Sequence, residues 1–320
     1  MSTVTSQIAS SGEFLQRTKL APIALFVYNR PEHTRLTVEA LRKNEFAQMS
    51  DLFVFADAPK NEADAARVEQ VRRVLRGIEG FRSVTLVERD QNLGLSKSII
   101  SGVTQLCAEY GRMISVEDDI VTAPDFLSFI NRGLEQYKDE PKIFSINGFN
   151  FPIVPPASYP WDAYFSYRSN SWGWGTWRDR WEKVDWSVSD FSEFIANRER
   201  QKRFNRGGSD LAEALAHSVA SKRDGSWDVV WAYTHSRHDA LALRPVVSKV
   251  YNVGFDGSGM HGRRAPFKQV ALLPNISPDY RLPDSVVEPD LYFAAEIQRL
   301  NRPSRARKAA RYLLNKLGRR

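Results

Sequence analysis

The feature that most limits how this chain folds is a regular alternation of apolar strand-forming runs and helical segments in its first half. Five short runs are rich in β-branched and aromatic residues, as buried strands are: residues 22–29, 51–57, 83–89, 112–116 and 142–147. Helical spacing of apolar residues lies between them, over residues 31–41, 62–77, 95–110 and 124–137. This alternation predicts an α/β fold, a mostly parallel sheet with helices on both faces.

The regular pattern ends near residue 150. Residues 151–187 are rich in Pro, Trp, Tyr and Gly, residues 188–224 have a charged helical pattern, and residues 241–253 predict one or two strands. We expect one continuous sheet to serve both halves. The predicted organisation is therefore a single domain over residues 21–298, between a loose leader at 1–20 and a basic tail at 299–320.

Composition narrows the class of protein. A chain of 320 residues with 42% hydrophobic content can bury a large core without disulfides. The single cysteine, Cys107, excludes a disulfide framework and indicates a reducing compartment. The chain has no apolar run of about 18 residues, and its first 20 residues lack the apolar region of a secretory signal. We therefore expect a cytoplasmic protein.

The charge is concentrated at the C-terminus. The chain has a formal net charge of +7, and residues 299–320 hold nine Lys or Arg and no Asp or Glu, so the rest of the chain is close to neutral. A near-neutral body argues against nucleic acid as a partner. In the tail, small and apolar residues recur at helical spacing: Ala306, Ala310, Leu313 and Leu317. This pattern predicts contact with an anionic membrane surface, and the alternative is a solvated terminus.

Polar residues follow several of the predicted strands, where open α/β sheets bind their ligands. They are Asn29 and Arg30 after the first strand, Asp57 after the second, and Glu117, Asp118 and Asp119 after the fourth. Three adjacent acids repel one another unless a cation neutralises them, and oxygen ligands suit Mn²⁺ or Mg²⁺. The triplet therefore predicts a metal site, with a solvated turn or a helix cap as the alternative.

A further group of polar residues follows the third strand, and the chain has no phosphate-loop motif. Asn92, Gly94 and Lys97 lie in the segment NLGLSK, where a glycine turn opens a helix. Free N–H groups at a helix start can hold an anion, although an ordinary strand-to-helix turn has the same sequence signal.

These residues together resemble a known family. An Asn-Arg after the first strand, an Asp after the second, NLGLSK after the third and an acidic triplet after the fourth resemble nucleotide-sugar glycosyltransferases of the GT-A fold. The segment VEDDIVTAPDF, residues 116–126, resembles the eukaryotic β-1,2-N-acetylglucosaminyltransferases that act on mannose. Looser matches follow in order at residues 172–177, 227–231, 244–248 and 257–262. We expect no membrane anchor or stem like those of the eukaryotic enzymes, so the chain resembles a bacterial relative.

The resemblance implies a role for each matching residue. Arg30 and Asp57 would hold the uridine of a nucleotide-sugar donor, and Glu117 and Asp118 would contact its ribose or sugar. Asp119 would ligate Mn²⁺, and Asp228 would be the general base. Further donor-binding residues would be Asn29, Asn92, Gly94, Lys97 and, in a loop that closes over the donor, His261. Residues 21–150 would form the nucleotide-binding half and residues 151–298 the acceptor half.

Two expectations come from the chemistry of the residues. Asp228 lies between Trp227 and Trp231, and an apolar setting would raise the pKa of its carboxyl towards that of a useful base; the alternative is a helix cap. Trp172, Trp174 and Trp177 could form a platform for a sugar ring, and the alternative is core packing.

The sequence therefore predicts an inverting, metal-dependent glycosyltransferase that moves a sugar from a nucleotide donor to a glycan or lipid-linked glycan. UDP-sugars, among them UDP-GlcNAc, are the expected donors, and the expected setting is surface polysaccharide or lipopolysaccharide assembly at the inner face of the cell membrane. The alternatives are a sugar-nucleotide nucleotidyltransferase and a non-catalytic nucleotide- or sugar-binding module of the same fold.

Overall fold

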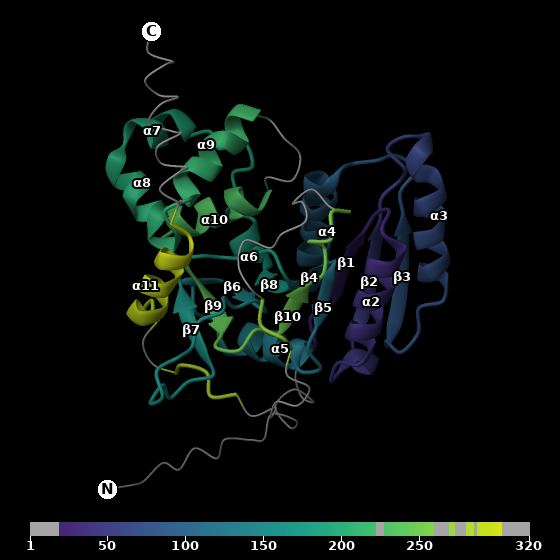
Figure 1. Ribbon diagram of the computed structural model, residues 1–320, viewed down its shortest axis with the longest axis horizontal. Helices are drawn as coiled ribbons and strands as arrows, with labels where there is room; N and C mark the ends of the chain where they lie inside the picture. The colour runs from purple at the N-terminus through teal and green to yellow at the C-terminus, as the bar shows by residue number, and fades with distance from the viewer. Residues whose placement is uncertain (1–18, 222–226, 259–268, 273–279, 285–286, 303–320) are drawn as a thin grey trace, which may run out of the picture.

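The computed structural model describes residues 19–221, 227–258, 269–272, 280–284 and 287–302. Its centre is an eight-stranded sheet with the strand order β3-β2-β1-β4-β8-β6-β9-β7, and β5 and β10 form a small second sheet (Figure 1). The main sheet takes strands from both halves of the chain. Its parallel pairs outnumber its antiparallel pairs, so the predicted α/β class with a mostly parallel sheet is confirmed.

The first half of the chain forms the five strands and four helices that its pattern predicts, and it adds a short strand and a 3₁₀ helix that were not predicted. The strands are β1 (Ile23–Val27), β2 (Asp51–Ala56), β3 (Ser83–Glu88), β4 (Arg112–Glu117), β5 (Ile120–Thr122) and β6 (Ile143–Asn147). The helices between them are α2 (Pro31–Arg42), α3 (Glu62–Arg76), α4 (Leu95–Tyr110) and α5 (Phe126–Gln136), with the short 3₁₀ helix η1 (Ala47–Met49) before β2. Proline opens α2, and the Asn61 side chain caps α3 by accepting from the Asp64 N–H.

The second half builds onto the same sheet in a different way. Its strands are β7 (Ala163–Ser166), β8 (Trp174–Trp177), β9 (Leu241–Pro245) and β10 (Val250–Asn252). Its helices are α6 (Arg178–Trp181), α7 (Phe191–Ala196), α8 (Arg198–Phe204), η2 (Asn205–Gly207), α9 (Leu211–Ser221), α10 (Trp227–Arg237) and α11 (Leu291–Leu300). The strand β8 lies between β4 and β6 and is antiparallel to both, which interrupts the parallel order.

Helices cover both faces of the sheet, because alternate side chains of each strand point to opposite faces. Ile23, Leu25 and Val27 of β1 join a core cluster with buried residues of α2, α3 and α5. Ala24 and Phe26 join a second cluster with residues of α4, α6 and α10. In Figure 1, α2 lies in front of the strands.

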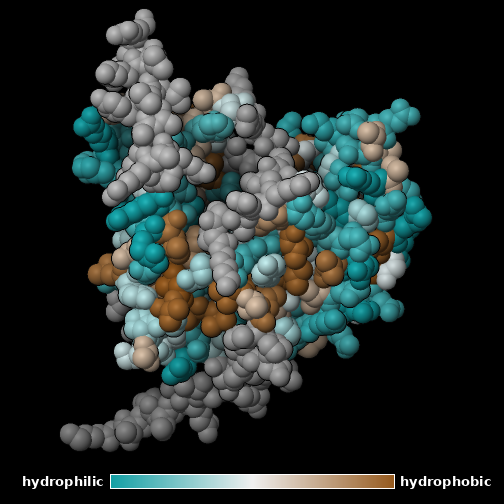
Figure 2. Space-filling view, viewed as in Figure 1, coloured by the Kyte–Doolittle hydropathy of each residue, from teal (hydrophilic) through white to brown (hydrophobic). Residues whose placement is uncertain are grey.

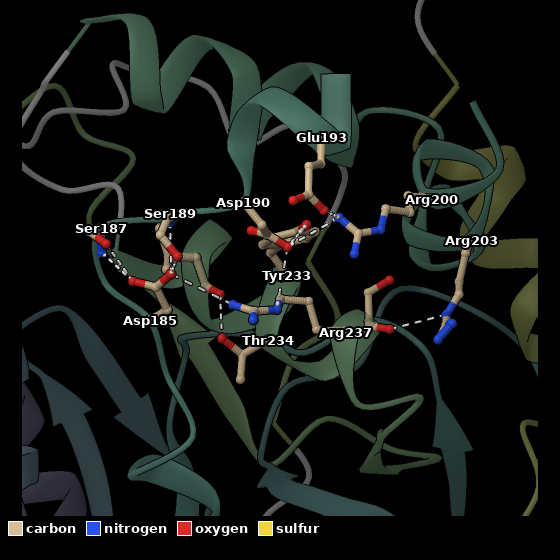
Figure 3. Close-up of polar contacts among 12 residues, drawn as sticks. Asp185, Ser187, Ser189, Asp190, Glu193, Arg200, Arg203, Tyr233, Thr234 and Arg237 are labelled. Atoms are coloured by element: carbon tan, nitrogen blue, oxygen red, sulfur yellow. Dashed lines mark hydrogen bonds and ion pairs between the residues drawn. The ribbon is translucent and has the colours of Figure 1, made fainter. Parts of the chain in front are cut away.

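A helical region made of α7, α8, α9 and α10 has a small core of its own and a polar network beside it. Asp190 lies at the centre of that network (Figure 3): its Oδ2 accepts from the Tyr233 hydroxyl at 3.0 Å and lies 3.6 Å from Arg237 Nε. Tyr233 and Arg237 belong to α10, so these contacts hold α10 against the segment before α7.

The surface seen in Figure 2 is hydrophilic over α2 and α3. The most exposed large apolar side chains of the described residues are Val154 and Leu291, at 80% and 78% exposure. No described helix combines the length and apolar character needed to cross a bilayer.

Candidate functional site

The acidic triplet lies at the carboxyl end of β4 and is paired with an arginine. Arg30 is the residue before α2, and its guanidinium contacts Asp118 through Nη2 and Asp119 Oδ2 through Nη1 at 3.0 Å. The sequence led us to expect that these acids need a metal ion to neutralise them. That expectation is corrected in part, because Arg30 already supplies one positive charge to two of the three carboxylates.

The fold brings Arg30 and the triplet together because β1 and β4 are parallel neighbours, with Phe26 opposite Glu117. The backbone around the triplet is fixed from two sides. The Thr37 hydroxyl donates to the Asp118 carbonyl at 2.8 Å, and the Val253 N–H donates to the Asp119 carbonyl at 2.9 Å.

Burial and like charge disfavour the ionised forms of Glu117 and Asp118. Burial and then the carboxylates of Asp119 and Asp118 raise the pKa of Glu117 well above its usual range; Arg30 opposes this and Asp228 adds to it. Burial also raises the pKa of Asp118, although Arg30 draws it down. Burial opposes the charged form of Arg30 as well, but the attraction of Asp118 and Asp119 outweighs it, so the pKa of Arg30 is raised.

The charge of Asp228 makes a small contribution to the raised pKa of Glu117. Asp228 belongs to the first turn of α10, where its Oδ1 accepts from the Val229 N–H at 2.8 Å. The apolar setting predicted for Asp228 is wrong: Trp227 and Trp231 are buried at 4% and 1% exposure, whereas Asp228 is exposed. Helix geometry explains the contrast with Trp227, since consecutive positions on a helix do not face each other.

Asp57 and the NLGLSK segment lie together, and hydrogen bonds within the protein already occupy the Asp57 carboxylate. Its carboxylate accepts from the N–H groups of Leu93 and Gly94 at 2.9 and 3.0 Å and is almost fully buried. Asn92 Nδ2 donates to the Ala58 carbonyl at 2.7 Å. Asp57 therefore shapes the turn before α4, and two N–H groups expected to face an anion are already bonded.

The remaining predicted donor residues lie beside this turn, contact another part of the protein or fall outside the described residues. Gly94 precedes α4 with a φ of 76°, a conformation that favours glycine, and Lys97 is exposed in the first turn of that helix. Asn29 Nδ2 donates to Asp64 of α3 at 2.8 Å, and the Tyr28 hydroxyl donates to the same carboxylate at 2.9 Å. His261 lies outside the described residues.

The three predicted platform tryptophans have different environments. Trp174 is fully buried among Trp181, Trp227 and Trp231, and Trp177 is 5% exposed with its indole N–H donating to the Leu134 carbonyl. Both are core residues, which corrects their assignment to a sugar platform. Trp172 is half-buried, packs against Phe149 and Phe255, and lies just before β8.

A cleft of about 470 Å³ opens beside Asp228. Its walls come from the segment before β8, from α9 and from the start of α10, and its lining residues include Asn170, Ser171, Glu213, Ala214, Trp227, Asp228 and Trp231. Its volume lies within the range of small-molecule sites, which is about 300–1,000 Å³.

The donor atoms at the triplet fit a divalent cation that is held only partly by protein. Among the residues with described positions, no three His, Cys, Asp or Glu side chains meet as a ligand set. The carboxylates of Glu117 and Asp119 are nevertheless hard oxygen donors, and their repulsion would be relieved by added positive charge. Mg²⁺ is commonly bound through one or two carboxylates and completed by substrate phosphates, and this donor set suits that arrangement.

Sequence reasoning missed residues that position the triplet. Thr37 and Val253 hold its backbone, and Gly254 packs directly against Asp119, where a Cβ would lie 2.1 Å from Asp119 Oδ2. A glycine directly after a predicted strand was the one available signal for the close approach. Nothing in the sequence indicates that Thr37 faces a carbonyl 81 residues away.

No protein-family model matches the chain, and no curated protein matches its sequence. Several solved structures are similar to it at low identity. A mannosyltransferase from Pyrobaculum calidifontis in complex with GDP-Man and Mn²⁺ is 10% identical, with a TM-score of 0.37 over 71% of this chain and 75% of that one. S. aureus TarS 1-349 is 11% identical, with a TM-score of 0.40 over 74% of this chain and 61% of that one. Mouse xyloside xylosyltransferase 1 is 13% identical, with a TM-score of 0.35 over 69% and 83% of the two chains.

Proposed function

We propose that the protein is an inverting, metal-dependent glycosyltransferase of the GT-A type. The observation that carries the proposal is the arrangement of charges at the carboxyl end of β4, where Arg30 pairs with Asp118 and Asp119 of the acidic triplet. The charge of Asp228 adds to the raised pKa of Glu117 in the same triplet. The proposed donor is a UDP-sugar such as UDP-GlcNAc, and the proposed acceptor is a hydroxyl of a glycan or lipid-linked glycan. The proposed setting is surface polysaccharide assembly at the inner face of the cell membrane.

In this proposal Asp119 holds the metal ion, with Glu117 beside it. A divalent ion at this position would offset the charge of the donor diphosphate. Arg30, which is paired with Asp118 and Asp119, would stabilise the charge that develops on the leaving nucleoside diphosphate.

Asp228 is the proposed general base. Its carboxylate would accept the proton of the acceptor hydroxyl while that oxygen bonds to the anomeric carbon of the donor sugar. The bond between the anomeric carbon and the phosphate oxygen breaks, and the nucleoside diphosphate leaves with the electron pair. One base and no enzyme nucleophile give direct displacement, so the configuration at the anomeric carbon inverts.

Thermal unfolding tests the donor class. The chain would be unfolded with UDP, GDP, CDP and dTDP, each with Mn²⁺ and with EDTA. A ligand of the folded state at a hundredfold excess over its Kd adds about 2.7 kcal/mol to the free energy of unfolding. We expect a shift with UDP that needs Mn²⁺ and is lost in Asp119→Ala. If no nucleotide raises the unfolding temperature, a non-catalytic binding module becomes the better interpretation.

Substitution of Asp228 tests the base. Asp228→Asn should keep the UDP- and Mn²⁺-dependent thermal shift and reduce sugar transfer by about 10²- to 10⁴-fold. Asp90→Asn, at an exposed position after β3, is the matched control and should transfer normally. Near-normal turnover of the Asp228 variant would remove this residue from the role.

A further inference from the structure

A short two-stranded ladder continues the chain directly after the acidic triplet. β5 pairs with β10 over three residue pairs, from Ile120–Asn252 to Thr122–Val250 (Figure 1). A ladder of this size is marginally stable by itself, so contacts at its two ends must hold the strands in one alignment. Because β5 follows Asp119 immediately, the alignment of β10 also determines what lies against the Asp119 carboxylate.

Asp119 itself forms the end of the ladder next to the triplet. The Val253 N–H donates to the Asp119 carbonyl at 2.9 Å, and a Cβ on Gly254 would lie 2.1 Å from Asp119 Oδ2. A shift of β10 by two residues keeps each side chain on its face of the ladder, but it would put Asn252 or Asp256 in the place of Gly254. Either side chain would displace the Asp119 carboxylate, and Asp256 would add a further negative charge.

A buried ion pair closes the other end of the ladder. Lys249 Nζ lies 2.7 Å from Asp125 Oδ2, and the two side chains are 3% and 4% exposed. The Tyr280 hydroxyl donates to the same carboxylate oxygen at 2.7 Å. A shift of β10 by two residues would put Val247 or Tyr251 in the place of Lys249, and neither side chain carries a positive charge. Of these three alignments, only the observed one forms the ion pair.

The chemistry of the pair suits a role in alignment better than a role in stability. The cost of removing two charges from water offsets much of their attraction, whereas buried polar groups are known to fix the register of packed elements. Resting on the proposed function, in which Asp119 holds the metal ion, we infer that Asp125 and Lys249 are positioning residues for the metal site. Their ion pair selects the alignment of β10 that places Gly254 against Asp119. They act through β10, because the ladder lies between them and Asp119.

Hydrogen exchange on the full chain tests the alignment without a ligand. Asp125→Asn with Lys249→Met removes both charges together, and this double variant should be more stable than either single variant, which leaves one charge buried alone. The Val253 amide should exchange about tenfold faster or more in the double variant, because its bond to the Asp119 carbonyl is no longer held in place. Amides of β1, in the main sheet, should exchange at the original rate.

A second ion pair of the same region provides the matched control. Arg112 Nη1 lies 2.7 Å from Glu135 Oε2, and this pair joins the start of β4, at the opposite end of that strand from the triplet, to the last turn of α5. Arg112→Met with Glu135→Gln should leave the Val253 amide protected. Unchanged exchange of Val253 in the first double variant, or equally fast exchange in this control, overturns the inference.

Binding of UDP with Mn²⁺ tests the consequence for the metal site. Calorimetric titration should give a Kd about tenfold higher or more for Asp125→Asn with Lys249→Met, equivalent to about 1.4 kcal/mol. The Kd of the control should equal that of the unchanged protein. A faster exchange of Val253 without any change in Kd would show that the alignment does not serve the metal site, and this result would overturn the positioning role.

A covalent lock tests whether the pair acts through the alignment. Thr122 and Val250 lie directly opposite each other as a pair that exchanges no backbone hydrogen bonds, so cysteines at these positions meet the geometry of a disulfide. Thr122→Cys with Val250→Cys, added to the double variant, should restore nucleotide binding when oxidised and lose it again when reduced. The same two cysteines in the otherwise unchanged protein should bind in both states. If the lock forms and binding stays weak, the pair does not act through β10.

The two assays separate this inference from the proposed function. If the unchanged protein binds UDP with Mn²⁺ and the double variant binds it equally well, the positioning role is wrong and the glycosyltransferase proposal stands. If the unchanged protein binds no nucleotide while Val253 exchanges faster in the double variant, the ion pair fixes the alignment. In that case the proposed function fails, and with it the metal site that the alignment would serve.

Discussion

Gly254 is the residue on which the geometry of Asp119 depends most directly. A Cβ at position 254 would lie 2.1 Å from Asp119 Oδ2 and 3.1 Å from Arg30 Nη1, so Gly254→Ala must displace both charged groups. We expect this variant to lose about 1–3 kcal/mol of stability and most of its Mn²⁺-dependent nucleotide binding. Calorimetric titration with UDP and Mn²⁺ measures the second effect. Gly77→Ala is the control, because a Cβ there meets its nearest atom at 3.7 Å; equal binding by the two variants would contradict the argument.

His235 gives the folded protein a dependence on pH. It is fully buried, its ring contacts the Trp231 carbonyl and the Ser145 hydroxyl, and burial lowers its pKa to about 4. The unfolded chain therefore binds a proton between the ordinary pKa of histidine and about pH 4, while the folded protein does not. Stability should fall by about 3 kcal/mol as the pH falls through this window. Urea unfolding at a series of pH values measures the loss.

The comparison with His235→Asn isolates this contribution. The variant should be less stable than the unchanged protein at neutral pH, and its stability should fall less as the pH decreases. His217→Asn, at an exposed position, should keep the original dependence. An equally steep dependence in His235→Asn would mean that other groups cause it.

The individual residues also show how far the sequence could predict the site. The triplet and Arg30 are neighbours of strand ends, and adjacent parallel strands bring those ends together, so pattern alone located them. Whether a side chain is buried depends on packing across the whole sheet. The sequence could not distinguish Trp174, which is in the core, from Trp172, which is half-buried two residues away.

At the scale of elements, the first half of the fold was predictable and the strand β8 was not. Parallel strands buried on both faces have continuous apolar sequences, such as Ile23–Val27, and their helices have a clear apolar spacing. The sequence of β8, Trp174–Trp177, contains a glycine and no aliphatic residue. That glycine is required by packing, since a Cβ at Gly175 would lie 2.9 Å from Ile130 of α5. Local propensity could not predict a strand set by such contacts.

The turn before α7 supports α10, and its stability should depend on Asp185. The carboxylate of Asp185 accepts from the N–H and hydroxyl groups of Ser187 and Ser189 (Figure 3), which lowers the pKa of Asp185. Because this pKa is lowered on folding, the contribution is present above the ordinary pKa of aspartate and is lost as the pH falls below it. Asp185→Asn should cost about 1–2 kcal/mol at neutral pH.

Denaturant unfolding of Asp185→Asn at neutral and acidic pH checks this expectation. The difference from the unchanged protein should shrink as the pH falls, because protonation of Asp185 weakens the same bonds that the variant lacks. Asp179→Asn, on the exposed side of α6, should show a smaller difference. A difference that stays constant down to acidic pH would contradict the assignment to charge.

At the scale of the whole molecule, the near-neutral body and the basic tail predict that the protein binds anionic membranes through its tail. The helix α11 extends to Leu300 and Arg299 pairs with Glu296, so the first two residues of the predicted tail belong to the fold. A truncation after Arg302 therefore leaves α11 whole. Each basic residue near an anionic surface contributes about 1 kcal/mol, and this attraction weakens as salt is added. The full chain should co-sediment with phosphatidylserine vesicles at low salt.

Two variants separate charge from apolar contact in this membrane prediction. Removal of residues 303–320 should abolish co-sedimentation and leave the Mn²⁺-dependent nucleotide shift unchanged, because the proposed donor site lies on the sheet. Leu313→Gln with Leu317→Gln keeps every basic residue of the tail. If the tail binds as an amphipathic helix, this double variant should bind more weakly at every salt concentration, since the apolar face supplies part of the affinity. Equal partition of the truncated and full chains would show that the tail does not direct the protein to membranes.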